Sequence, residues 1–159
     1  MRDRQTQGVN SHQPADPSNR VHLRVARLGG AAVVLALFAA AMWFAWLGWD
    51  QEYYLVDGVA QGPYRAWQVL GCGLSISAAA VLAYLWAPSV WAVFVLAAAA
   101  DLGFAVAWSR DAASTDDSGL WVVGLLFLLV GSGLGLLVVL TITAVVAARG
   151  RPHQHARVA

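Results

Sequence analysis

Asp101 is the residue whose chemistry is least expected from its surroundings. It lies in the stretch AAAADLGFA, residues 97–105, where every neighbour is apolar or glycine. A carboxyl group within such a stretch is costly to place in lipid, and intramembrane acids mark ion pathways, proton relays or contacts with a second polar group. The function of the chain therefore depends on which elements surround Asp101.

The composition indicates an integral membrane protein. Of the 159 residues, 59% are hydrophobic and only 12% are charged, whereas soluble domains are usually about one-quarter charged. All ten basic residues are arginine, and they lie in the tails and connections. The expected environment is a lipid bilayer.

Four apolar stretches are long enough to cross a hydrocarbon core of about 30 Å, which needs roughly 20 residues as a helix. They cover residues 28–49, 67–86, 90–108 and 120–148, approximately. Helices are expected because open strands would leave backbone groups unpaired in lipid. The first stretch is too long for a signal-peptide core, so it is predicted to be retained.

The arginines predict the orientation. Eight of them lie in the N- and C-terminal tails, and only Arg65 and Arg110 lie in the connections on the other side. By the positive-inside rule both termini are cytoplasmic. The prediction is an all-α membrane protein, a bundle of four transmembrane helices at residues 24–149 in the cell inner membrane. A disordered tail at 1–23 and a short tail at 150–159 flank the bundle.

Small residues predict which helix faces pack, because lipid provides little hydrophobic drive for helices to associate. The second span carries small residues at every fourth position. The fourth span carries a GxxxG pair with a further glycine two turns earlier. These candidate packing residues are Gly71, Ser75, Ala79 and Ala83 in the second span, and Gly124, Gly131 and Gly135 in the fourth. Contact within one bundle is favoured over homodimerisation.

Asp101 costs about 2.5–3.5 kcal/mol to insert at a helix centre. The eight Leu, Phe and Val residues of its span favour insertion by about 2.4–4.8 kcal/mol. The two contributions nearly cancel, so the third span is expected to insert most readily as a hairpin with the second. No Arg, Lys or His lies within a span, and an unpaired buried carboxyl is expected to stay protonated. Depth from the membrane boundary places it level with Ser75 and Ser132.

A neutral Asp101 donating to Ser75 or Ser132 is the favoured interpretation. Two alternatives stay open: a protonation or cation site, and contact with a basic residue of another membrane protein.

No motif indicates an enzyme, a cofactor or a nucleic-acid site. Phosphate loops, dinucleotide fingerprints and metalloprotease motifs are absent. Cys72 is the only cysteine, so no intramolecular disulfide can form. No metal site is predicted, because His153 and His155 lack further ligands and the acidic run at Asp111, Asp116 and Asp117 resembles a solvated loop.

The segments WLGWDQEYY and GPYRAWQV, together with four spans and arginine-rich tails, resemble uncharacterised small four-helix integral membrane proteins of GC-rich bacteria. That resemblance implies an architecture and no activity. Small multidrug transporters also have four short helices, but their essential acid lies in the first span. This sequence has none there, so that function is not carried over.

Two function classes follow. The favoured one is a non-enzymatic polytopic membrane protein that acts through helix contacts, as an accessory, assembly or scaffold component with a membrane protein partner or as a homo-oligomer. The alternative is a small transporter or ion-conducting oligomer that uses Asp101.

Overall fold

The computed structural model describes residues 17–49, 54–56, 59–62, 64–115 and 118–150. These residues form four helices and one short hairpin: α1 (Pro17–Trp46), β1 (Tyr54–Val56), β2 (Val59–Gln61), α2 (Ala66–Trp86), α3 (Val90–Thr115) and α4 (Trp121–Arg149). All four helices are long and apolar enough to cross a membrane. The sequence-based prediction of an all-α architecture with four candidate spans is therefore confirmed.

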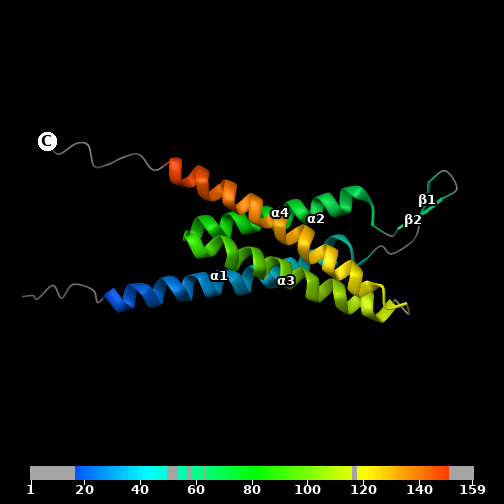
Figure 1. Cartoon of the computed structure of the whole chain (residues 1–159), viewed down its shortest axis with the longest axis horizontal. Helices are drawn as coiled ribbons and strands as arrows, with labels where there is room; N and C mark the ends of the chain where they lie inside the picture. The colour runs from blue at the N-terminus through cyan, green and yellow to red at the C-terminus, as the bar shows by residue number, and fades with distance from the viewer. Residues whose placement is uncertain (1–16, 50–53, 57–58, 63, 116–117, 151–159) are drawn as a thin grey trace, which may run out of the picture.

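The helices alternate in direction along the bundle (Figure 1). α1 begins, α2 ends, α3 begins and α4 ends at one end, which we call the terminal end. The opposite end, called the hairpin end, holds the antiparallel β1–β2 pair, in which Leu55 lies opposite Ala60. α4 crosses α2 and α3 obliquely (Figure 1).

α1 begins earlier than the sequence predicted. It starts at Pro17, so residues 17–23 are helical and do not belong to a disordered tail; residues 1–16 lie outside the described part. Backbone N–H groups in the first turn of a helix have no partner within the helix. Proline, which has no N–H, is therefore favoured there because it loses no hydrogen bond. Once the apolar span is helical, further residues join it at little cost.

α3 also continues beyond the predicted end of its span at Trp108, as far as Thr115. In this last turn the Ser114 hydroxyl donates to the Asp111 carbonyl oxygen at 2.7 Å, and the Thr115 hydroxyl reaches the same oxygen at 3.1 Å. Ser and Thr hydroxyls commonly bond back in this way to a carbonyl oxygen three or four residues earlier in a helix. The first part of the segment predicted as a polar loop is therefore helical.

α3 is the central helix, because the two most extensive helix contacts of the bundle, with α1 and with α4, are both made by it. Its buried surface is made mainly of alanine. At Gly103 the two backbones nearly touch: a Cβ placed there would lie 2.7 Å from Ala36 Cα and still closer to the Ala36 carbonyl oxygen. Small residues on both helices permit this approach, as expected for packing within lipid.

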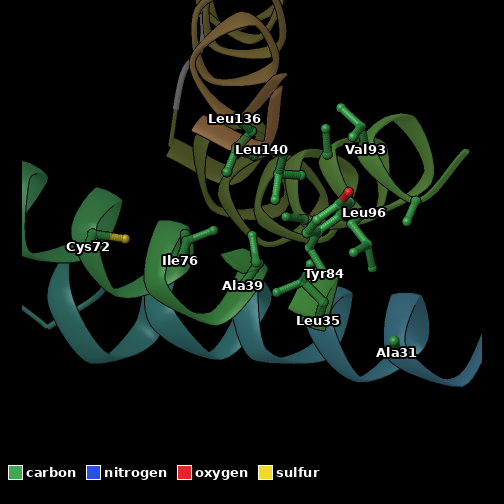
Figure 2. Packing of buried hydrophobic residues seen from close by; sticks show 14 of the residues in the cluster. Ala31, Leu35, Ala39, Cys72, Ile76, Tyr84, Val93, Leu96, Leu136 and Leu140 are labelled. Atoms are coloured by element: carbon green, nitrogen blue, oxygen red, sulfur yellow. The ribbon is translucent and has the colours of Figure 1, made fainter. Parts of the chain in front are cut away.

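The buried face of α2 lies one residue away from the predicted ladder. The fully buried residues are Gln68, Cys72, Ile76, Ala80 and Tyr84. The predicted residues Ala79 and Ala83 lie at the margin of this face, partly buried against the core. One residue corresponds to about 100° around a helix, so the larger side chains of Ile76 and Tyr84 fill the centre and the small ones border it (Figure 2).

α4 is the most apolar of the four helices and the least buried. Only Leu136 and Leu140 are buried on it, and both point into the bundle (Figure 2). Many of its other large apolar side chains, including Phe127, Val130 and Leu134, are exposed and available to lipid or to another protein.

The contact between α1 and α3 gives a direct stability prediction. Gly103→Ala places a methyl group against Ala36 and should lower the free energy of unfolding by about 1–3 kcal/mol, the usual cost of overpacking. Gly30→Ala is the matched control, because its methyl group would meet nothing within 4 Å. Thermal unfolding in one detergent measures both, and equal melting temperatures would contradict the close approach.

Candidate functional site

Asp101 lies on the face of α3 that meets α4. Its side chain is 8% exposed, and its helix neighbours Ala97, Ala100 and Ala105 are equally buried. Because these neighbours are alanines, α4 can approach α3 closely at this level. The residues of α4 that meet the carboxyl group are Ser132 and Gly133.

The Ser132 hydroxyl joins Asp101 to the backbone of α4. Its Oγ is in close hydrogen-bond contact with Asp101 Oδ1 and lies 2.6 Å from the carbonyl oxygen of Leu128. A serine hydroxyl has one proton to donate, and a carbonyl oxygen can only accept. Both oxygens lie where the Ser132 hydroxyl can donate to them, and its single proton serves one of them at a time. The hydroxyl donates to Asp101 Oδ1 when the acid is ionised, and it can donate to Leu128 when the acid is neutral. The neutral acid is the expected state, because no Arg, Lys or His lines the cavity beside Asp101 in the described residues.

Gly133 provides the space for the second carboxyl oxygen. A Cβ at this position would lie 3.2 Å from Asp101 Oδ2 and 3.7 Å from Asp101 Cγ. A larger residue would push the carboxyl group away from α4. Ser132 and Gly133 therefore act together: Ser132 is the hydrogen-bond partner of the carboxyl group, and Gly133, which has no side chain, leaves room for it.

A cavity of about 500 Å³ opens beside Asp101, between α2, α3 and α4. Its wall is largely apolar and includes four aromatic side chains. These are Tyr64, Phe104, Trp108 and Phe127. Oxygen-bearing side chains at mid-depth are Asp101, Ser77 and Ser132. An apolar cavity with a few converging polar groups is the usual form of a small-molecule site.

The other predicted polar partner, Ser75, does not meet Asp101. Its hydroxyl donates to the carbonyl oxygen of Gly71 on its own helix at 2.7 Å. Ser77, two residues further along α2, lines the cavity. The side of α2 that carries Ser77 thus faces the same cavity as Asp101.

The predicted packing glycines divide into two groups. A Cβ on Gly71 would lie 2.8 Å from the Trp46 ring of α1, and one on Gly124 would lie 3.1 Å from the Trp108 ring of α3. Gly131 and Gly135 have nothing within 4 Å at that position. Gly135 lines the cavity between α2, α3 and α4, and Gly131 is not among its lining residues. The close backbone contact seen at Gly103 is therefore not repeated at this GxxxG pair.

Sequence reasoning missed one buried polar residue. Gln68 is fully buried at the start of α2, where its Oε1 accepts a hydrogen bond from the Arg65 backbone N–H at 2.8 Å. Its spacing of three residues from the helix cap was the available signal. Within the described residues, Gln68 Nε2 and Trp43 Nε1 are buried donors without a partner.

The described part of the chain holds no group of three or more His, Cys, Asp or Glu side chains that could bind a metal ion. Asp111 lies in the last turns of α3. His153, His155, Asp116 and Asp117 lie outside the described residues.

Comparison of the chain with protein-family models, with curated proteins and with solved structures returns no match. The resemblance drawn from the sequence motifs is thus supported only at the level of a small four-span membrane protein.

The neutral state of Asp101 predicts an infrared signature. The protein in detergent at neutral pH should show the carbonyl stretch of a protonated carboxylic acid, which an ionised carboxylate lacks. The difference spectrum against Asp101→Asn isolates this band, and Ser132→Ala should shift it by removing the hydrogen-bond partner of the acid. A difference spectrum that contains only carboxylate bands would contradict the neutral state expected for Asp101.

Proposed function

We propose that this chain is a non-enzymatic membrane protein that acts through contacts between its helices and another membrane helix. The observation that carries the proposal is the open face of α4, defined by Gly131 and Gly135. Both glycines are exposed, and a Cβ on either would meet nothing within 4 Å, although Gly135 also borders the cavity. GxxxG pairs allow two helix backbones to approach closely in lipid.

The surroundings of this face support the same role. Val130, Leu134 and Val138 flank the glycines along α4 and are well exposed. A partner helix seated on the glycines would cover these side chains. The occupant is an accessory or assembly partner in the same membrane, or a second copy of the chain.

The distribution of arginines supports an orientation with both termini in the cytoplasm of a bacterial cell and the helices in its inner membrane. Arg20, Arg24 and Arg27 on α1 and Arg149 at the end of α4 lie at the terminal end of the bundle. Arg65 and Arg110 lie at the hairpin end, next to the start of α2 and in the last turns of α3. Arginines accumulate on the cytoplasmic side of membrane proteins.

The open face of α4 predicts a variant that loses assembly without losing its fold. Gly131→Leu combined with Gly135→Leu should abolish a complex or oligomer recovered in mild detergent from the native membrane, because the added side chains keep a second helix away. Monomer stability should stay the same, since both additions point into open space. Native mass spectrometry of the purified protein measures the stoichiometry.

Gly30→Leu is the matched control, because Gly30 also has nothing within 4 Å of its Cβ position but lies on α1. It should leave the complex intact. A wild-type protein that is always a lone monomer, or a complex unchanged by the α4 substitutions, would contradict the proposed role.

A second candidate function has its own supporting observation. Asp101 lines the cavity, and a carboxyl group that reaches a cavity could exchange protons or cations during transport. Such a role requires water to enter. The apolar and aromatic wall favours a dry cavity.

Thiol labelling separates the two candidates. In a Cys72→Ser background, Ser77→Cys places a thiol in the cavity wall, and Ser75→Cys places one outside it. We expect a membrane-permeant maleimide to label Ser77→Cys and a charged, water-soluble thiol reagent to leave it unmodified. Selective labelling of Ser77→Cys by the charged reagent would favour the transport function.

A further inference from the structure

The aromatic residues of the cavity form a path that ends at Asp101. On α3, Phe104 and Trp108 follow Asp101 by three and seven residues and share its face, and all three line the cavity. Seven residues correspond to about 10 Å along the helix. Tyr64 and Phe127 line the same cavity from its other sides. An apolar molecule lying along this path would have one end at the carboxyl group.

The chemistry of the wall limits what that molecule can be. The residues that line the cavity include one acid and no Arg, Lys or His within the described part of the chain. Ammonium groups are attracted to carboxyl oxygens by charge-assisted hydrogen bonds and to aromatic faces by cation–π interaction. The volume of about 500 Å³ is within the usual range for a small-molecule site.

We propose that this cavity binds a lipophilic amine, with the amine nitrogen at Asp101 and the apolar body against Phe104 and Trp108. A hydrocarbon chain alone would fill the apolar part but leave the carboxyl group unused. The amine uses both. This inference goes beyond the proposed function, because binding in the cavity requires no partner helix.

Ser132 lies where its hydroxyl can stabilise Asp101 when the acid becomes ionised on binding the amine. A neutral amine takes the carboxyl proton: the N–H bond forms as the O–H bond of Asp101 breaks, which leaves an ammonium–carboxylate pair with no net charge. An amine that arrives protonated displaces the same proton to water. In both cases Asp101 becomes an acceptor only.

The hydroxyl of Ser132 can then turn from the Leu128 carbonyl oxygen to Asp101 Oδ1, which it already contacts. Leu128 is not left unpaired, because its carbonyl oxygen keeps the backbone hydrogen bond of the helix. The site therefore has a hydrogen-bond donor for the ionised acid and an acceptor for the neutral one.

The test compares two probes that differ only in the head group, 1-pyrenebutylamine and 1-pyrenebutanol. The protein is held in nanodiscs of zwitterionic phosphatidylcholine, so that anionic lipid does not attract the amine. Energy transfer from tryptophan to pyrene reports binding. The wild type should bind the amine saturably, one per chain, and about tenfold more tightly than the alcohol.

Asp101→Asn should weaken binding of the amine by about tenfold and remove its advantage over the alcohol. Ser75→Ala, which alters a hydroxyl outside the cavity wall, should change neither probe. Equal binding of amine and alcohol by the wild type, or an undiminished preference for the amine in Asp101→Asn, would overturn the proposal.

A second variant covers the case in which Asp101→Asn does not fold. Gly73 lines the cavity and has nothing within 4 Å of its Cβ position, so Gly73→Leu fills the cavity without a clash. It should abolish saturable binding of the amine, and unchanged binding would show that the probe lies elsewhere. Gly73 is on α2, so this variant leaves Gly131 and Gly135 of α4 unchanged, although Gly135 borders the same cavity. Native mass spectrometry of Gly73→Leu should show the same stoichiometry as the wild type, which separates amine binding from the proposed function.

Discussion

The fold depends on the surface of α3. In lipid, helices gain little by hiding apolar side chains from one another, so close contact of backbones has to hold them together. The alanines of α3 and the near contact of Gly103 with Ala36 provide it against α1. α2 and α4 then pack on this pair, and α4 does so with two buried residues only. The most extensive contact of the bundle is therefore the one between α1 and α3.

Asp101 fixes the position of α4 on α3. The apolar side chains of α4 alone would not specify that position. Ser132 satisfies the carboxyl group and Gly133 makes room for it. Both residues can do so only at one rotation and one height of α4. A buried polar pair of this kind contributes little net stability, since hydrogen bonds between membrane helices average about 0.6 kcal/mol. It does specify the arrangement, and it leaves the acid at the wall of a cavity.

Apolar run length predicted the spans of α2 and α4 almost to the residue, because in both helices the apolar sequence continues to the helix ends. It could not predict the continuation of α1 to Pro17 or of α3 to Thr115, since those turns lie in polar sequence. Depth along the helices placed Ser75 and Ser132 level with Asp101. Which of the two serines contacts the carboxyl group depends on the rotation of α2 and α4 about their own axes, which depth does not give. Small residues lie on several sides of α2 and α4, so they did not fix that rotation. A Cβ on Gly131 or Gly135 accordingly meets nothing within 4 Å, whereas one on Gly133 meets Asp101.

The central claim is that α4 lies on α3 with Gly133 against Asp101 and Gly131 facing away. Cysteine cross-linking tests it most directly, because the Gly133 Cβ position lies 3.7 Å from Asp101 Cγ, near the reach of a disulfide. In a Cys72→Ser background, Asp101→Cys with Gly133→Cys should form an intramolecular disulfide under mild oxidation. Asp101→Cys with Gly131→Cys should form none within the chain. An intramolecular cross-link through position 131, with none through 133, would contradict the account.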